Sequence, residues 1–197
     1  MSMKVLVVLA HPNADSFSHA IAQRALDSLE SAGHDAQLLD LYALGFRAAM
    51  SAEERAAYHT DTPIVDPMIA EHAALIRRID TLVFIYPTWW SSLPAILKGW
   101  LERVMVPGVA FVFDDAGKVR RNLVHIRHIV GISTYGSPRL YVRAMNDNGR
   151  RTLTRALRMT CGWRTRCKWL GLYAIDTATV DKRAEFLQRV DRRMRSL

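Results

Sequence analysis

The chain has 197 residues, enough for one domain with a full hydrophobic core. Half of its residues are hydrophobic and 23% are charged, which excludes a disordered chain, a collagen-like fibre and a low-complexity scaffold. The net charge of +8 is uneven, because residues 1–100 hold 7 Lys or Arg and 11 Asp or Glu whereas residues 101–197 hold 20 and 8. A basic half of this kind suits an anionic partner or, equally, a solvated basic surface.

The sequence carries no signal for a membrane span or a metal site. Its longest unbroken apolar run, from Val5 to Ala10, has six residues, whereas a membrane helix needs about 20. Cys161 and Cys167 are too few for a disulfide framework, and their spacing matches no zinc or redox motif. We therefore expect a cytoplasmic protein that forms a single domain over residues 1–197, with no integral membrane segment and no bound metal.

Strand and helix signals alternate along the chain. Residues 3–10 are predominantly apolar and rich in β-branched side chains, which predicts a strand buried on both faces. Phe17, Ile21 and Leu29 share one helical face, which predicts a helix that ends near Gly33. Further strands are expected at residues 36–41, 81–86, 128–134 and 169–175, further helices at residues 67–79, 94–104, 140–159 and 180–197, and a hairpin turn at residues 114–117.

This alternation predicts an α/β fold in which one doubly wound sheet of five parallel strands carries helices on both faces. In such a sheet a ligand binds beyond the carboxyl ends of the strands, where the strand order reverses. The loops that follow the first, third and fourth strands are therefore the candidate ligand-binding segments.

The first of these loops has the residues of a phosphate site. It opens a helix near Ser16, where backbone N–H groups and the positive end of the helix dipole attract anions. The hydroxyls of Ser16 and Ser18 and the imidazole of His11 can complete such a cradle. Alternatively, Asp15 or Ser16 serves only as the helix cap. No Gly-rich dinucleotide fingerprint and no Walker A loop occurs in the chain, which disfavours Rossmann NAD binding and nucleotide hydrolysis.

The second loop places two adjacent indoles, Trp89 and Trp90, directly after a buried strand. Large flat side chains at this position suit the edge and face of a planar conjugated ring. The backbone from Thr88 to Trp90 can meanwhile bond the polar edge of that ring. Packing of both tryptophans in a core or an interface is the alternative.

The third loop, residues 133–138, is rich in hydroxyls and contains Gly136, which lets the backbone approach a ligand closely. Its sequence around Ser133 partly resembles a nucleophile elbow, but Tyr135 stands where the second glycine is required. A serine esterase is therefore a weak alternative function.

Together the three loops resemble those of the flavodoxin-like NAD(P)H:quinone oxidoreductases of the DT-diaphorase type. The resemblance extends from about residue 3 to residue 175 and implies the strand order 2-1-3-4-5. The run from Leu93 to Val104 is its most specific part. The motifs that carry it are Ala10-His11-Pro12 with Ser16-Phe17, Tyr86-Pro87 with Trp89, Leu93-Pro94-Ala95-Ile96-Leu97-Lys98-Gly99-Trp100-Leu101-Glu102-Arg103-Val104, Ser133-Thr134-x-Gly136-Ser137, Tyr141, and Cys161-Gly162-Trp163.

The resemblance implies a flavin site with three parts. The flavin phosphate or pyrophosphate and the ribityl chain are expected at His11, Asp15, Ser16, Phe17 and Ser18; the isoalloxazine along Pro87, Thr88, Trp89 and Trp90; and its pyrimidine edge at Ser133, Thr134, Tyr135 and Gly136. Tyr141 is the expected catalytic residue, because a hydroxyl donor there stabilises negative charge on the reduced flavin or on a quinone oxygen. The mammalian members have a histidine six residues after that tyrosine, where this chain has Asp147.

The implied activity is two-electron reduction of a quinone-like acceptor by a ping-pong mechanism, with NADPH or NADH as electron donor. The match around His11 and Ser16 favours FAD, with FMN as the alternative. A homodimer is also implied, with the helix at residues 94–104 and its Trp100 at the interface or in the core. The rival function is a flavin-binding regulatory subunit of a potassium efflux-type transporter. Nucleic-acid binding is not expected, because no module for it is present.

Overall fold

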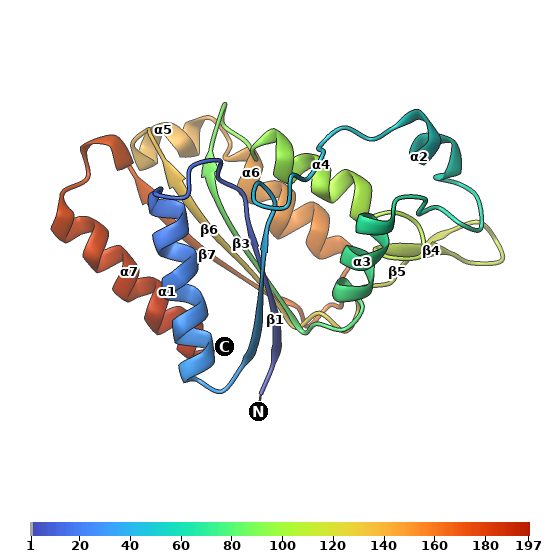
Figure 1. Cartoon of the computed structure of the whole chain (residues 1–197), viewed down its shortest axis with the longest axis horizontal. Helices are drawn as coiled ribbons and strands as arrows, with labels where there is room; N and C mark the ends of the chain where they lie inside the picture. The colour runs from blue at the N-terminus through green and yellow to red at the C-terminus, as the bar shows by residue number, and fades with distance from the viewer. Residues whose placement is uncertain (1) are drawn as a thin grey trace.

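The computed structural model describes residues 2–197 and contains a parallel sheet in the order β2-β1-β3-β6-β7 (Figure 1). Its strands are β1 (Lys4–Leu9), β2 (Asp35–Asp40), β3 (Thr81–Thr88), β6 (His128–Tyr135) and β7 (Arg166–Tyr173). The strands β4 (Phe111–Phe113) and β5 (Val119–Arg121) form a separate antiparallel hairpin around the predicted turn. The main strands thus have the order 2-1-3-4-5, and the predicted flavodoxin-like sheet is confirmed.

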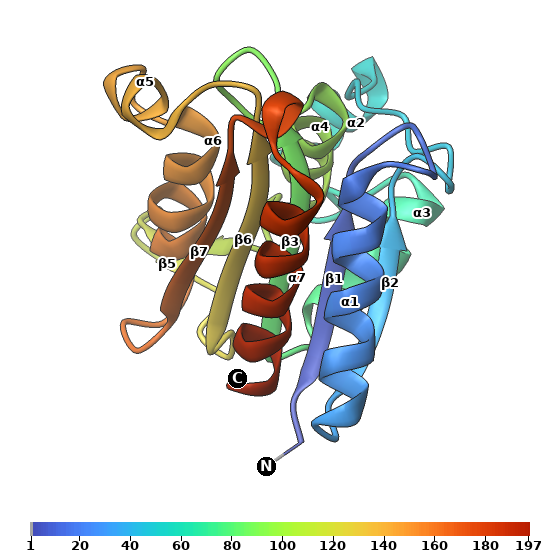
Figure 2. The same ribbon diagram turned by 90° about the vertical axis from the view of Figure 1, so that its left-hand side faces the viewer.

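Helices cover both faces of the sheet (Figure 2). One face carries α1 (Phe17–Ser31) and α7 (Val180–Arg195), and the other carries α3 (Pro67–Ile76), α4 (Ala95–Val104), α6 (Asn148–Arg151) and the π-helical segment Thr152–Leu157. The short helices α2 (Ala52–Ala57) and α5 (Arg139–Ala144) and the 3₁₀ turn Ile175–Thr177 complete the described elements. Alternate β1 side chains enter opposite cores, as the pleat of a strand buried on both faces requires. No helix among residues 2–197 is long and apolar enough to cross a membrane.

The helix predicted at residues 140–159 is not continuous. Asn146 and Asp147 have φ of 71° and 40°, so the chain turns through the left-handed region between α5 and α6. The helix that follows widens into π geometry at Thr152. The turn brings Gly149 against the Tyr86 hydroxyl so closely that an added Cβ would lie 3.0 Å from it. Periodicity alone does not report such a turn, because the apolar positions on both sides keep helical spacing.

The Trp100 side chain lies in the core, and the structure does not place it at a molecular surface. Trp100 is fully buried, and its indole N–H donates to Nδ1 of His72 at 3.3 Å. Phe84 of β3 meets its ring edge-on, with the ring centroids 6.2 Å apart. This aromatic and histidine packing fixes α4 against α3 and the sheet.

A buried arginine ties the long α2–α3 connection to α4. Arg103 is 3% exposed and donates to Glu54 at 2.7 Å and to Asp66 at 2.6 Å. Its third guanidinium contact is the carbonyl of Arg47. Burial by itself would raise the pKa of Asp66, but the hydrogen bonds from Arg103 and from the backbone of Met68 outweigh burial and lower it.

We expect Arg103→Met to lower the free energy of unfolding by about 3–5 kcal/mol, because it leaves the buried Glu54 carboxylate without a cation and with the backbone N–H of Ser51 as its remaining donor. The matched control is Lys98→Met, which breaks the half-exposed Lys98–Glu102 pair and costs less than about 1 kcal/mol. The lowered pKa of Asp66 means that its contribution is present at neutral pH and is lost as the pH falls through that pKa. Urea denaturation at neutral and acidic pH checks this. Equal destabilisation by the two variants at neutral pH would contradict it.

Candidate functional site

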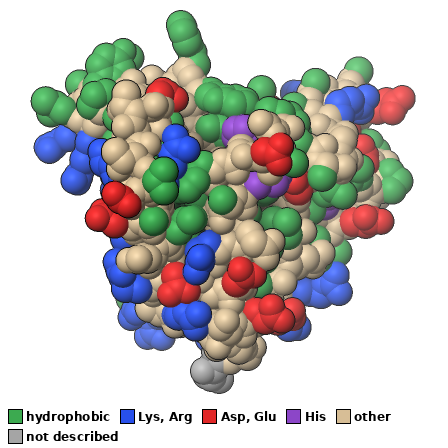
Figure 3. All heavy atoms as spheres, turned by 60° about the vertical axis from the view of Figure 1, so that its left-hand side comes forward, with side chains coloured by type: hydrophobic (Ala, Val, Ile, Leu, Met, Phe, Trp, Pro, Cys, Tyr) green, Lys and Arg blue, Asp and Glu red, His purple; other side chains and the backbone are tan. Residues whose placement is uncertain are grey.

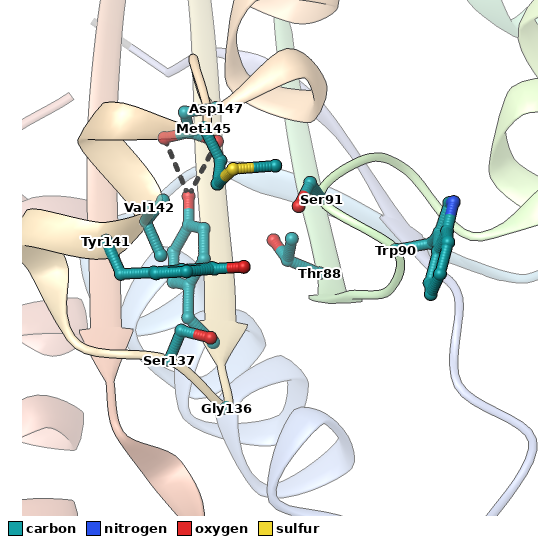
Figure 4. Close-up of a pocket in the computed structure, with 10 residues that line it drawn as sticks. Thr88, Trp90, Ser91, Gly136, Ser137, Tyr141, Val142, Met145 and Asp147 are labelled. Atoms are coloured by element: carbon teal, nitrogen blue, oxygen red, sulfur yellow. Dashed lines mark hydrogen bonds between the residues drawn. The ribbon is translucent and has the colours of Figure 1, made fainter.

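A cavity of about 250 Å³ lies where β3 and β6 end, at the carboxyl edge of the sheet. Figure 4 shows its lining, which comes from the loop after β3 on one side and from the end of β6, α5 and the turn after α5 on the other. The lining residues are Thr88, Trp90, Ser91, Tyr135, Gly136, Ser137, Tyr141, Val142, Met145 and Asp147. The third and fourth main strands thus bring two of the three predicted loops to one cavity.

The β3 loop holds Trp90 in an unusual position. Trp90 and Ser91 both have positive φ, 48° and 58°, and two backbone hydrogen bonds between Trp89 and Ser92 close the turn. Such backbone geometry is costly for residues with a side chain and is typical of binding sites. The Trp90 side chain is fully exposed and stands apart from the other lining residues (Figure 4). A fully exposed indole on a strained turn offers a free flat surface to a ring-shaped ligand or to a partner chain.

The opposite side of the cavity is supported by a hydrogen-bond network. The Tyr135 hydroxyl donates to the Asp147 carboxylate at 3.1 Å and accepts the indole N–H of Trp169 at 3.0 Å. The Tyr135 ring stacks on Tyr173, with the centroids 4.6 Å apart. This network links β6, β7 and the turn between α5 and α6.

The network sets the protonation of its members. Burial raises the pKa of Asp147, although the hydrogen bond from Tyr135 and the charges of Arg150 and Arg151 oppose the rise. Burial first, and then the Asp147 charge, raise the pKa of Tyr135. Tyr135 therefore stays protonated at neutral pH and remains a hydrogen-bond donor.

Tyr141 lies on α5 with its hydroxyl directed toward Thr88 (Figure 4). Its side chain is 55% exposed, and its hydroxyl has no hydrogen-bond partner among residues 2–197. A free hydroxyl at the cavity can donate to an oxygen of a bound molecule. Tyr141 thus lies at the cavity, and its catalytic role stays a prediction.

Ser133 does not have the surroundings of a nucleophile. It is fully buried, and its hydroxyl shares a 2.8 Å hydrogen bond with the hydroxyl of Thr88. Among the described residues no imidazole contacts it, so the geometry does not support a serine esterase. At Gly136, in the loop after β6, an added Cβ would lie 3.0 Å from Oδ2 of the exposed Asp176 side chain, which would have to move aside.

The loop after β1 lies next to the cavity without lining it. The Ser16 side chain caps α1 by accepting from the backbone N–H of His19, and it also bonds the His19 ring at 3.0 Å. The amides of Phe17 and Ser18 meet no acceptor in the described part of the chain, as expected for the first turn of a helix. His11 contacts Trp89 with a centroid distance of 5.9 Å. Burial lowers the pKa of His11, whose Nδ1 accepts the backbone N–H of Asn13.

The structure separates the predicted residues into four groups. Thr88, Trp90, Tyr135, Gly136 and Tyr141 line the cavity, whereas His11, Asp15, Ser16 and Trp89 lie at the first loop or against it. Ser18 is buried in the first turn of α1, at 2% exposure. Pro87, Ser133 and Thr134 are buried within the ends of β3 and β6. Phe17 packs toward the core, with its ring 6.3 Å from that of Phe186, and does not face the cavity. We infer that Phe17 contributes its backbone amide, and not its ring, to any ligand site.

Sequence reasoning missed several residues that shape the site. His19 joins Ser16 to Asp40, whose carboxylate lies 3.1 Å from the His19 ring. His19 could have been identified from the sequence, because it is the third residue of the helix, from which a side chain can reach back to the N-cap residue. Ser137 also lines the cavity; it belongs to the motif that ends the third loop but was given no role, whereas the lining residues Ser91, Val142 and Met145 carried no signal of their own. No group of three or more His, Cys, Asp or Glu side chains within residues 2–197 is arranged to hold a metal ion.

These features define the class of protein. The five main strands are parallel and have the order 2-1-3-4-5, and a cavity lined in part by aromatic side chains lies beyond their carboxyl ends. This arrangement is typical of a doubly wound α/β protein of flavodoxin-like type. A family model described as a flavodoxin-like fold matches residues 3–197.

Named relatives narrow the class. The chain is 30% identical over 158 residues to ribosyldihydronicotinamide dehydrogenase (quinone) of Pongo abelii, covering 71% of this chain and 67% of that one. It is 29% identical to NAD(P)H dehydrogenase (quinone) 1 of Rattus norvegicus over 156 residues, 70% of this chain and 56% of that one. A solved NAD(P)H:quinone oxidoreductase from Methanothermobacter marburgensis superposes with a TM-score of 0.85 at 27% identity, covering 100% of this chain and 97% of that one.

The chain belongs to the flavodoxin-like NAD(P)H:quinone oxidoreductase family, and the resemblance seen in the sequence is confirmed. The chain spans about half the length of several curated relatives, 56% in the rat protein.

We expect Tyr135→Phe to raise the pKa of Asp147 further, because the substitution removes a hydrogen bond that favours the carboxylate. It also leaves the Trp169 indole without its acceptor, at a cost of about 1–3 kcal/mol in the free energy of unfolding. The control is Tyr173→Phe, which keeps the ring stack and changes no donor to Asp147. Carboxyl NMR titration of Asp147 checks the shift. An unchanged Asp147 titration in Tyr135→Phe would show that this hydrogen bond is not formed in solution.

Proposed function

We propose that the protein is a flavin-dependent NAD(P)H:quinone oxidoreductase in which residues 1–197 act as one flavin-binding domain. The observation that carries the proposal is the cavity between Trp90 and Tyr141, next to the first turn of α1. Relatives named as NAD(P)H dehydrogenases (quinone) support the reaction class. The comparisons give no support to the alternative, a regulatory subunit of a potassium efflux-type transporter.

The residues of the site fit a flavin. The two amides at the start of α1 offer donors for a phosphate group, and their helix dipole favours negative charge. The strained loop after β3 offers the flat face of Trp90, and the third loop offers the backbone around Gly136. Anion donors and ring-binding surfaces thus lie on neighbouring loops, as a phosphorylated planar cofactor requires.

Each loop has a distinct part in holding the cofactor. We assign the phosphate to the amides of Phe17 and Ser18, with His11 beside them. The isoalloxazine is assigned to the cavity between Trp90 and the Tyr135–Gly136 backbone. FAD is the favoured flavin and FMN the alternative.

A bound flavin supplies the chemistry, because it accepts a hydride from NADPH or NADH and passes two electrons to a quinone-like acceptor. The protein orients the rings and stabilises charge. The Tyr141 hydroxyl donates to an oxygen that becomes negative on the bound molecule. Tyr135 and Asp147 keep the cavity wall in place, so Tyr141 and Thr88 stay on opposite sides of the ligand.

We further propose a cytoplasmic homodimer. Large apolar side chains in and beside the cavity lining are exposed: Met145 is 45% exposed, and Leu140, the residue before Tyr141, is 80% exposed, in addition to Trp90. A second copy that covers this rim would bury these side chains and exclude water from the reacting rings.

The first prediction of the proposal is that the purified protein binds a flavin. An absorbance spectrum should show the two bands of an oxidised flavin, and both should bleach when NADPH or NADH is added without air. Chromatography of the cofactor released by heat separates FAD from FMN. A protein that takes up neither flavin on reconstitution would overturn the proposal.

The second prediction concerns the exposed indole. Trp90→Ala should weaken flavin binding at least tenfold, about 1.4 kcal/mol, while the free energy of unfolding stays within about 0.5 kcal/mol. The matched control is Trp163→Ala, because Trp163 is also an exposed tryptophan (75%) and lies outside the cavity. Fluorescence titration with FMN and with FAD measures the flavin affinity of each variant. Equal flavin affinity in the two variants would place the isoalloxazine elsewhere.

A further inference from the structure

A second cavity, of about 370 Å³, lies directly beside the first. The two cavities share Val142 and Asp147 in their walls. The lining of the second cavity, which we call the arginine cleft, consists of Arg139, Val142, Arg143, Asn146, Asp147, Arg150, Arg151, Thr154, Arg155 and Tyr173. One elongated molecule can therefore occupy both cavities across a common wall.

The arginine cleft has a large unbalanced charge. Five of its lining residues are arginines, and within residues 2–197 none of the five forms an ion pair. The single carboxylate in the lining, Asp147, accepts the Tyr135 hydroxyl instead. The buried Arg103, by contrast, is matched by Glu54 and Asp66. Basic side chains also gather along one edge of the face drawn in Figure 3.

The backbone brings these arginines together by two departures from regular helix. The left-handed turn at Asn146 and Asp147 places the end of α5 opposite the start of α6. The π-helical segment that follows then turns Thr154 and Arg155 toward the same cleft. Single π turns within helices occur frequently at functional sites. A basic helix face that is only solvated would need neither the left-handed turn nor the π-helical segment.

We propose that the arginine cleft binds the phosphate-bearing half of the dinucleotide electron donor and takes its 2′-phosphate, so that it selects NADPH over NADH. This inference rests on the proposed function. Guanidinium groups bind phosphate oxygens in pairs of hydrogen bonds, and several free arginines suit a dianionic monoester better than a neutral hydroxyl. The first cavity, at about 250 Å³, has room for the isoalloxazine and not for a dinucleotide in addition, so the phosphate-bearing part of the donor must lie outside it.

The position beside a ring-binding cavity favours a small phosphate ester over a nucleic acid. Both ligands would neutralise arginines, but only a dinucleotide needs a ring site within reach of its phosphates. The shared residues Val142 and Asp147 supply that proximity.

The test is the double variant Arg143→Gln/Arg151→Gln in the purified protein with its cofactor. Both arginines are exposed, so the fold should be retained. The control is Arg55→Gln/Arg192→Gln, which removes the same charge at exposed positions outside the arginine cleft. Calorimetry with adenosine 2′,5′-bisphosphate should give a dissociation constant at least tenfold higher in the cleft variant than in the control. The ratio of kcat/KM for NADPH to that for NADH should fall at least tenfold in the same variant.

Each outcome decides a separate point. Equal affinity for adenosine 2′,5′-bisphosphate in the two variants would overturn the phosphate site. Binding of 5′-AMP as tight as that of the bisphosphate would overturn selection of the 2′-phosphate. A single-stranded oligonucleotide that binds more tightly than the bisphosphate, and loses affinity in the cleft variant, would show that the ligand is a nucleic acid. If neither NADPH nor NADH is oxidised while bisphosphate binding still needs the two arginines, the proposed function is wrong and the phosphate site remains.

Discussion

The hydrogen bond from the Tyr135 hydroxyl to the Asp147 carboxylate joins the end of the fourth main strand to the turn between α5 and α6. Asp147 adopts left-handed backbone geometry there, and this costs about 1 kcal/mol or more for a residue with a side chain. The hydrogen bond and the stack of Tyr135 on Tyr173 help to offset that cost. Asp147 also separates the two cavities, so the shape of both depends on this contact.

The same contact decides which groups are free to meet a ligand. Because the Tyr135 side chain bonds Asp147 and Trp169, the third loop can offer a ligand its backbone and Gly136, but not the Tyr135 hydroxyl. The Ser133 hydroxyl is likewise engaged with Thr88. The hydroxyls of Tyr141 and Ser137 are then the ones on that side of the cavity that remain available. Mammalian members of this type are expected to have a histidine at the position of Asp147. In this chain the Asp147 carboxylate accepts the Tyr135 hydroxyl and so has a structural role.

The sequence was sufficient for the sheet and its ligand-binding edge. Apolar, β-branched segments such as residues 5–10 can be buried on both faces only in a parallel sheet covered by helices, and the structure has that arrangement. The loop residues Thr88, Trp90, Gly136 and Tyr141 followed from the strand ends and from the family resemblance. The helical period placed Phe17 on the apolar face of its helix, and its ring packs against Phe186 there, whereas the family resemblance had assigned Phe17 to the flavin site. The turn at Asp147 also could not be predicted from the sequence, because only tertiary contacts favour positive φ at that residue.

Charge connects the two cavities. In the proposed function, reduction of an acceptor by two electrons would place negative charge on an oxygen in the first cavity, and a charge there interacts strongly with nearby groups when water is excluded. Asp147 alone would oppose that charge. The five free arginines of the adjoining cleft would stabilise that negative charge, and they outnumber the single carboxylate. A donor phosphate bound in the cleft would neutralise part of this positive field during hydride transfer, and its departure would restore the field before the acceptor is reduced. Alternate occupation of the site by donor and acceptor thus agrees with the electrostatics of the two steps.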